Sequence, residues 1–442
     1  MNKKNKIKKS LRFSFLDGVF CSCMLGLTTD YITPYALSLK ATLSQIGILS
    51  AVPNLASSII QLKSADAAEK LKSRRNVINI FVFLHALMGI PIMLIPYFFR
   101  GHPILFLVTF VTLFTSFNTF AAPAWSSLMS EYIPYKMRGK YFGWRNKILG
   151  VVTIASAFLS GFILHCFKNN ILRGFLIIFS LATISRFISW YFLTKMYEPP
   201  LIFKKEHSFS ILDFIRRVRE SNFAKFVLFV SSLNFCVNLA SPFFSVFMLR
   251  DLKFSYITYT IVVTTVTIAQ IFTFDRWGNL ADKIGNIKVL RFTSLFIAGL
   301  PLWWVFNQSP LYLVFIQIIS GFAWSGFNLC ASNFIFDAVS AQKRVRCISY
   351  FNAFSGIATC LGAFLGGYLI NILPLLFGYK ILSLFLISSL LRFLVVFLLS
   401  PKIKEVRKAE NISSKDLFYS VIGIRPFPGL AEESQQILRK EE

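Results

Sequence analysis

The sequence predicts an all-α membrane protein whose twelve transmembrane helices form two parallel six-helix repeats. Three observations lead to this fold class. The 442-residue chain is 55% hydrophobic and 15% charged, whereas roughly a quarter of the residues in soluble domains are charged. Its apolar runs reach about 20 residues, the length that crosses a bilayer as a helix. The second half of the chain also repeats the first.

The apolar runs place six spans in each half of the chain. They lie near 13–37, 44–62, 77–99, 104–130, 144–167, 171–194, 226–249, 255–275, 290–307, 310–336, 347–373 and 376–400. Helices are expected because backbone groups in hydrocarbon must be satisfied within the segment, and the runs lack the alternation of barrel strands. We therefore expect an N-terminal six-helix bundle at 1–194, a linker at 195–225, a C-terminal bundle at 226–400 and a tail at 401–442.

The positive charges predict the orientation. On this layout 38 of the 47 Lys and Arg residues lie on the side that holds both termini, and seven lie on the other. Positive charge favours the cytoplasmic face, so both termini, the linker and the tail are expected there, in the bacterial cytoplasmic (inner) membrane. This asymmetry accounts for the net charge of +27, and nucleic-acid binding is not expected because the bases are not gathered on a folded soluble surface.

The two halves match when the chain is shifted by 206 residues. AFLSG at 157–161 then falls on AFLGG at 363–367, Arg138 falls on Arg344, and Gly150 falls on Gly356. Because six is an even number of crossings, both copies run in the same direction. Parallel repeats of this kind occur in alternating-access transporters.

The stretch at 277–291, WGNLADKIGNIKVLR, is expected to be a loop between two spans. It resembles the signature loop of the major facilitator superfamily at Gly278, Asp282, Lys283, Gly285 and Lys288. The first-half counterpart at 65–75 lacks the glycines but keeps the charges of Glu69, Lys70 and Arg75. The resemblance implies loops that take part in gating.

A second pattern supports the same resemblance. Glu131 followed by Arg138 is similar to the end of the fourth helix in that superfamily, and Asp337 with Arg344 repeats it in the second half. Acids and bases at adjacent helix ends could form a latch that closes one side of the membrane. The alternative, that such charges only mark the wet face, stays open.

Polar residues inside the spans are the candidates for binding solute or protons, because a carboxylate at mid-bilayer costs roughly 2.5–3.5 kcal/mol. Asp30 is the main candidate, together with Tyr31 and Tyr35, and its repeat mate is Asn238. Further candidates are Asn118, Trp125, Gln270, Trp324 and Asn328.

Four other polar residues of the spans receive structural interpretations. Asp17 is expected to meet Arg12 or headgroup water, and His85 is expected to be a packing residue. Arg186 and Arg392 are expected to be structural partners of the acidic loops.

The sequence thus predicts a secondary active transporter that moves a small solute by alternating access with proton coupling. No phosphate-binding loop, HExxH pattern or serine–histidine–acid context is present, so no catalytic residue, cofactor or metal is expected. The expected partners are the solute, protons and membrane lipids, and the protein is expected to be a monomer. Two alternatives stay open, a polytopic membrane enzyme acting on lipid and a non-transporting membrane receptor or scaffold.

Overall fold

The computed structural model describes residues 3–61, 63–133, 135–199, 221–339 and 341–406. These residues contain twelve helices long and apolar enough to span a membrane, which confirms the predicted fold class. The helices of the first half are α1 (Lys3–Thr28), α2 (Ile32–Ser38), α3 (Leu43–Gln61), α4 (Ser64–Lys70), α5 (Arg74–Phe98), α6 (Pro103–Tyr132), α7 (Tyr135–Cys166), the short 3-10 helix η1 (Lys168–Asn170) and α8 (Ile171–Thr194).

The second half begins with α10 (Asn222–Val246), which continues into a single π-helical turn, η2 (Phe247–Asp251). It is followed by α11 (Tyr256–Ile284), α12 (Asn286–Phe306), α13 (Pro310–Ala338), α14 (Ala341–Ile372), α15 (Lys380–Leu399) and the 3-10 helix η3 (Ser400–Lys402). The predicted linker at 195–225 and tail at 401–442 lie mostly outside the described residues, and their bounds stay predictions.

Local sequence signals explain several helix starts. Ser73, Ser221 and Ser255 precede α5, α10 and α11, and each side chain accepts a hydrogen bond from the backbone N–H three residues on. A serine cap satisfies one of the free donors of a helix N-terminus. Proline opens α6 and α13, where its missing N–H costs nothing.

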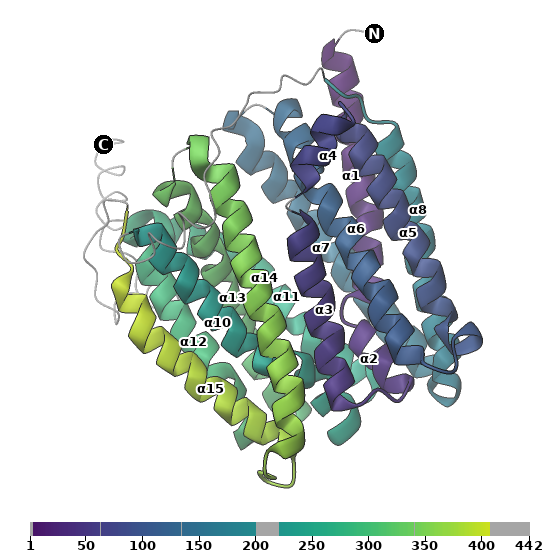
Figure 1. The fold of residues 1–442 in the computed structure, drawn as a ribbon, viewed down its shortest axis with the longest axis vertical. Coiled ribbons are helices and arrows are strands. Elements are labelled where there is room, and N and C mark those ends of the chain that lie inside the picture. Colours follow the sequence, from purple (N-terminus) through teal and green to yellow (C-terminus); the bar gives the residue numbers. More distant parts are fainter. Residues whose placement is uncertain (1–2, 62, 134, 200–220, 340, 407–442) are drawn as a thin grey trace, which may run out of the picture.

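The spans form two groups that lie side by side, with α1 to α8 on the right and α10 to α15 on the left in Figure 1. The groups meet where α3 packs against α14 and where α7 packs against α11. Because the number of crossings is even, α1 begins and α15 ends on the same side of the membrane. We call this the terminus side and the opposite one the far side.

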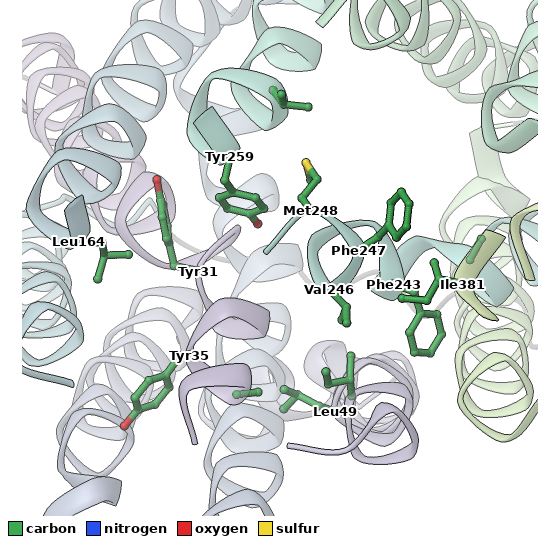
Figure 2. Close-up of a cluster of buried hydrophobic side chains, with 14 of the residues drawn as sticks. Tyr31, Tyr35, Leu49, Leu164, Phe243, Val246, Phe247, Met248, Tyr259 and Ile381 are labelled. Atoms are coloured by element: carbon green, nitrogen blue, oxygen red, sulfur yellow. The ribbon is translucent and has the colours of Figure 1, made fainter. Parts of the chain in front are cut away.

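The apolar cores show how the groups meet. On the far side one continuous cluster joins them, because Tyr31, Tyr35 and Leu49 of the first half share it with Phe247 and Tyr259 of the second (Figure 2). Towards the terminus side each half has a cluster of its own. One contains Val77, Phe120 and Leu193, and the other contains Phe226, Trp277 and Phe334. The hydrophobic core therefore unites the halves on the far side.

Candidate substrate path and gates

The first predicted span is broken on its far-side half. Helix α1 ends at Thr28, and α2 begins at Ile32. Pro34 has no N–H to offer the carbonyl four residues earlier, which belongs to Asp30. Tyr259 of α11 donates its hydroxyl to that carbonyl oxygen at 2.6 Å. A side chain from the second half thus satisfies a backbone group that the first half leaves without its helical partner.

A second tyrosine joins the halves next to this contact. The Tyr31 hydroxyl oxygen lies 2.6 Å from the Ala157 carbonyl oxygen and 2.6 Å from Thr260 Oγ1. The rings of Tyr31 and Tyr259 meet edge to face with their centroids 6.2 Å apart, and Figure 2 shows both rings in the shared core. Both side chains are fully buried, so these hydrogen bonds are shielded from water.

Helices α3 and α14 approach closely on the same side. A methyl group added at Gly47 would lie 2.8 Å from the Ala363 carbonyl oxygen and 2.9 Å from Gly367 Cα. Asn371 Nδ2 donates to Ser44 Oγ at 2.8 Å, and Ser44 donates to the Gly367 carbonyl at 3.2 Å. Small residues let two helix backbones meet in this way. We name Tyr31, Ser44, Gly47, Tyr259, Thr260, Gly367 and Asn371 the far-side gate.

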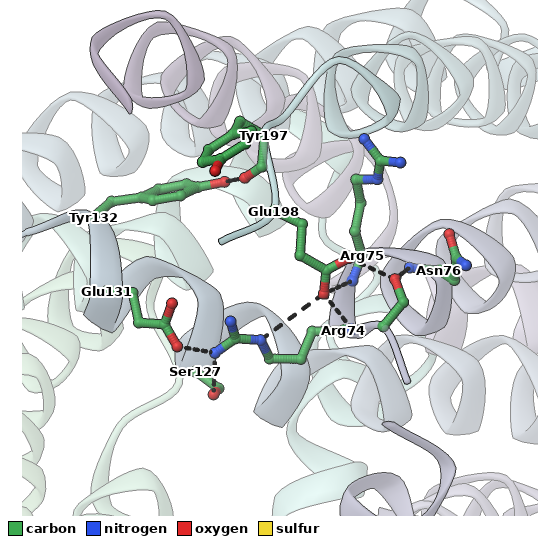
Figure 3. A network of polar contacts seen from close by, with 9 residues as sticks. Arg74, Arg75, Asn76, Ser127, Glu131, Tyr132, Tyr197 and Glu198 are labelled. Atoms are coloured by element: carbon green, nitrogen blue, oxygen red, sulfur yellow. Dashed lines mark hydrogen bonds and ion pairs between the residues drawn. The ribbon is translucent and has the colours of Figure 1, made fainter. Parts of the chain in front are cut away.

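A charge network lies at the terminus-side ends of α5 and α6 (Figure 3). Arg74 Nη1 lies 2.5 Å from Glu131 Oε1, and Arg74 Nε lies 4.0 Å from Glu198 Oε1. The Arg74 side chain is 4% exposed and that of Glu131 is 39% exposed. The arginine is therefore buried, while its main partner reaches water.

Glu198 also holds the start of α5. Its Oε1 accepts from the backbone N–H of Arg74 at 2.6 Å, and its Oε2 accepts from Ser73 Oγ at 2.5 Å. A carboxylate at a helix N-terminus is stabilised by the free N–H groups and the helix dipole. Tyr132 donates its hydroxyl to the Tyr197 carbonyl, and burial raises the pKa of Tyr132 to about 12. It therefore stays a neutral donor at physiological pH.

The sequence predicted only part of this network. Glu131 was expected to act in a latch, but Arg74 and Glu198 were not singled out. Arg75 donates instead to the Met196 carbonyl at 3.2 Å, and Lys70 is exposed at the end of α4. The side chains of Glu69, Arg138 and Arg344 lie outside the described part of the molecule, so their pairing stays a prediction.

The loop expected at 277–291 is almost entirely helical, which corrects the prediction. Helix α11 runs to Ile284 and α12 starts at Asn286, so Gly285 alone separates them. Its φ of 90° is a conformation that only glycine adopts without strain. Asn286 donates to Asp337 Oδ2 at 2.7 Å, which ties this corner to α13. Of the other signature residues, Asp282 is exposed, and Gly278, Lys283 and Lys288 are partly buried.

A buried polar network inside the first six spans corrects the interpretations of Asp17 and His85. Asp17 accepts from Ser189 Oγ at 2.7 Å, and Ser189 in turn accepts from Arg186 Nη1 at 3.0 Å. Arg186 also donates to His85 Nδ1 at 2.8 Å and to Asn118 Oδ1 at 3.0 Å. Asp17 is 5% exposed, so it meets neither Arg12 nor headgroup water, and His85 is more than a packing residue.

Arg392, the repeat mate of Arg186, likewise bonds within its own half. It donates to Ser388 Oγ and to the carbonyls of Ile297 and Val237, at 3.1, 2.9 and 3.2 Å. The expected partnership of the two arginines with acidic loops is therefore wrong, because both guanidinium groups are buried among helices of the same half.

The predicted binding residues are spread over several environments. Tyr31 lies in the far-side gate, whereas Tyr35 donates to the Ile92 carbonyl at 2.9 Å within the first half. Asp30 is exposed at the break between α1 and α2. Asn238 donates to the Asn234 carbonyl at 2.9 Å and to Thr359 Oγ1 at 3.4 Å. Asp30 thus adjoins the far-side gate, whereas Asn238 bonds to residues of the second half.

The remaining candidates are also dispersed. Asn118 belongs to the Arg186 network, and the Trp125 ring lies 5.0 Å from the Arg145 guanidinium carbon. Trp324 meets Phe327 edge to face at 5.7 Å. Gln270 is half-buried on α11, and Asn328 is exposed on α13. Within the described residues no three His, Cys, Asp or Glu side chains are grouped so that they could hold a metal ion.

Two six-helix groups that meet through buried contacts on one side of the membrane define the class of a twelve-span helical membrane protein. The family model of the Major Facilitator Superfamily matches residues 18–244 and again residues 226–431. The chain belongs to this superfamily. It is therefore an integral membrane protein, and its family consists of secondary transporters of small solutes, not of enzymes, as the sequence predicted.

Individual proteins match this chain at low sequence identity or over a short part of its length. The tetracycline resistance protein, class H, of Pasteurella multocida is 30% identical over 139 residues, which are 30% of this chain and 34% of that protein. The match thus spans about a third of the relative's length. The solved structure of the nucleoside transporter NupG has a TM-score of 0.63 at 15% identity and covers 91% of this chain and 100% of its own.

A D-xylose-proton symporter gives a TM-score of 0.67 at 13% identity, with 92% of this chain and 98% of its own covered. At these identities both solved structures establish the fold alone.

Proposed function

We propose that this transporter works by alternating access, with the halves rocking about a solute site between them. The single observation that carries the proposal is the difference between the two sides of the molecule. One apolar core spans both halves on the far side, while each half has its own core towards the terminus side. Such an arrangement suits a state that is closed on the far side. In the other state of the cycle, the residues of the far-side gate would separate.

We also propose that the terminus side is cytoplasmic and that the membrane is the bacterial cytoplasmic membrane. The charge asymmetry of the loops supports the orientation. The bundles at 1–194 and 226–400 would be the moving bodies, joined by the linker at 195–225. The latch residues would stabilise the opposite, terminus-closed state. They are Glu69, Lys70, Arg75, Glu131, Arg138, Gly278, Asp282, Lys283, Gly285, Lys288, Asp337 and Arg344.

Proton coupling is a further part of the proposal. Asp30 is the first candidate for the titrating group, because it lies at the break in α1 beside the gate residue Tyr31 and next to the bond from Tyr259. Asp17 is the rival candidate, because it is a buried carboxylate that reaches Arg186 through one serine hydroxyl. The remaining predicted binding residues, Tyr35, Asn118, Trp125, Asn238, Gln270, Trp324 and Asn328, are proposed to line or support the path.

The substrate is best sought by thermal stability. A ligand that binds only the folded protein raises its melting temperature, and the rise grows with the logarithm of the ligand concentration above its Kd. The panel should contain nucleosides, pentoses and tetracyclines, since relatives of these names share the fold or part of the sequence, together with organic anions and peptides. A stabilising compound should then cross the membrane of vesicles containing the purified protein. Binding without any flux would reject transport and favour a receptor.

A further inference from the structure

A basic pocket lies where α1 begins and α8 ends, on the terminus side of the first six spans. It is a cavity of about 230 Å³ lined by Lys6, Lys9, Ser10, Phe13, Lys195 and Tyr197. We call it the lysine pocket. Its base is fixed by the Tyr197 backbone N–H, which donates to Ser10 Oγ at 2.8 Å. None of the three lysines belongs to the far-side gate or to the Arg74 network, and Tyr197 links the pocket to that network through its carbonyl.

Among the described residues, no acid pairs with the three ammonium groups of the pocket. The ion pairs found in the described part of the chain join Arg74 and Arg250 to acids and include none of these lysines. Each ammonium instead lies near an aromatic ring, with Lys6 5.2 Å from the centroid of Tyr197, Lys9 5.8 Å from Phe13 and Lys195 5.1 Å from Tyr191. Three like charges around one cavity repel one another, so a bound anion would be stabilised there.

The position of the pocket decides which anion it suits. Lys195 directly follows the last residue of α8, Thr194, and Lys6 and Lys9 precede the apolar part of α1. The lysines therefore lie at the level of lipid headgroups. Towards the bilayer, Phe192 stacks on Phe13 and on Phe20, with centroids 6.2 and 5.9 Å apart. A strip of aromatic rings thus leads from the pocket into the hydrocarbon.

We propose that the lysine pocket binds the phosphate headgroup of an anionic phospholipid, whose acyl chains lie along Phe13, Phe20 and Phe192. A free phosphate would satisfy the lysines equally well but would leave the aromatic strip unused. Basic pockets between membrane helices bind acidic lipid headgroups in this way. The bound lipid would hold the segment of Tyr197, whose carbonyl accepts from Tyr132 and whose next residue, Glu198, caps α5.

The test uses the purified full-length protein in a neutral detergent. Phosphatidylglycerol, phosphatidylcholine or inorganic phosphate is added, and melting temperature and lipid retained in native mass spectrometry are measured. The pocket variant carries Lys6→Gln, Lys9→Gln and Lys195→Gln. The matched control variant carries Lys63→Gln, Lys147→Gln and Lys402→Gln, three exposed terminus-side lysines outside the pocket, so that both variants lose the same charge.

We expect phosphatidylglycerol to stabilise the parent and the control variant more than phosphatidylcholine does. In the pocket variant its apparent affinity should fall about tenfold or more, since three positive charges near the anionic headgroup are lost. An equal loss in both variants would show diffuse charge attraction and overturn the site. If inorganic phosphate stabilised the protein as much as phosphatidylglycerol does, the proposal that the pocket binds a lipid would be overturned.

Discussion

Tyr259 donates its hydroxyl to the backbone carbonyl of Asp30, 2.6 Å away in the other half of the molecule. The carbonyl is available because Pro34, four residues later, has no N–H. The bond can exist only while the halves are together on the far side. One proline in the first repeat and one tyrosine in the second thus make far-side closure depend on a particular hydrogen bond.

Tyr259→Phe should therefore weaken far-side closure. The substitution also removes the contact with Ser245, but that contact lies inside the second half. The one hydrogen bond lost between the halves is worth about 0.5–1.5 kcal/mol, so the closed population should fall roughly two- to tenfold relative to the open one. Spin labels at Lys168 and Leu375, exposed far-side positions in the two halves, would report this in a cysteine-free background as a shift to longer distances. Tyr35→Phe is the control, because Tyr35 bonds within the first half. An equal shift in the control would remove the argument for Tyr259.

Gly47→Ala should obstruct the same closure by a steric route. The added methyl group would lie within 3 Å of backbone atoms of Ala363 and Gly367, which cannot rotate away. Overpacking of this kind costs about 1–3 kcal/mol. Oxidative cross-linking between Ser44→Cys and Asn371→Cys, residues that are hydrogen-bonded in the parent, should become slower by about fivefold or more. Gly101→Ala has open space around it and should leave the cross-linking rate unchanged.

The number and order of the spans could be predicted from the sequence, because hydrophobic length and repeat spacing can be read along the chain. The pairing of buried polar groups could not. Arg186 and Asp17 are joined through Ser189. Nothing in the sequence distinguishes Ser189 from the many other serines of the chain, so this link could not be predicted. His85 was interpreted as a packing residue because its neighbours in sequence are apolar. Its hydrogen-bond partner, Arg186, is 101 positions away in the sequence.

The gate could be predicted only in part for the same reason. Tyr31 was singled out because it adjoins an acid, but its partner Thr260 lies in a different repeat, at a position without a matching motif. The prediction of a loop at 277–291 was also wrong, because the segment is helical except at Gly285. Gly285 and its charged neighbours resemble a loop by composition, yet one residue of positive φ is enough to turn the chain between α11 and α12.

Glu131→Gln should destabilise the terminus side of the first half. Arg74 is buried, and its Nε and Nη2 atoms have no hydrogen-bond partner within the described residues, so it relies on its acidic neighbours. Because Glu131 is partly exposed, we expect a loss of about 1–2 kcal/mol rather than the 3–5 kcal/mol of a fully buried pair. The melting temperature should fall in Glu131→Gln and stay near the parental value in Asp275→Asn, which removes an exposed acid of α11. Equal melting temperatures in both variants would show that the pair contributes nothing.

Reporter fusions after residues 205 and 405 should both be active as cytoplasmic reporters. The expectation follows from the 38 Lys and Arg residues on the terminus side against seven on the far side and from the even number of crossings. Fusions placed after residues 101 and 308, in far-side connections, serve as the opposite control. A cytoplasmic signal from the far-side fusions, or its absence from the terminus-side ones, would contradict the orientation.

Asp30→Asn tests proton coupling. A coupled carrier needs a group that is charged in one half of the cycle and neutral in the other, and a carboxylate whose surroundings change between gate states meets that need. Asp30 lies at the break in α1, and its carbonyl bond to Tyr259 must break when the far-side gate opens. The substitution keeps the size of the side chain and the backbone bond, so it removes the titration while leaving the gate in place.

We expect Asp30→Asn to abolish accumulation driven by a pH gradient while counterflow of the stabilising solute continues at a similar rate, because exchange requires binding and alternation but no net proton movement. Both assays are run in vesicles on the parent, on Asp30→Asn and on Asp17→Asn. Asp17 is bonded to Ser189 within the first half and away from the gate, so its variant should keep accumulation if Asp30 is the coupling group. Parental accumulation in Asp30→Asn together with its loss in Asp17→Asn would instead assign coupling to the buried Asp17–Ser189–Arg186 network. Parental accumulation in both variants would exclude each carboxylate as the coupling group.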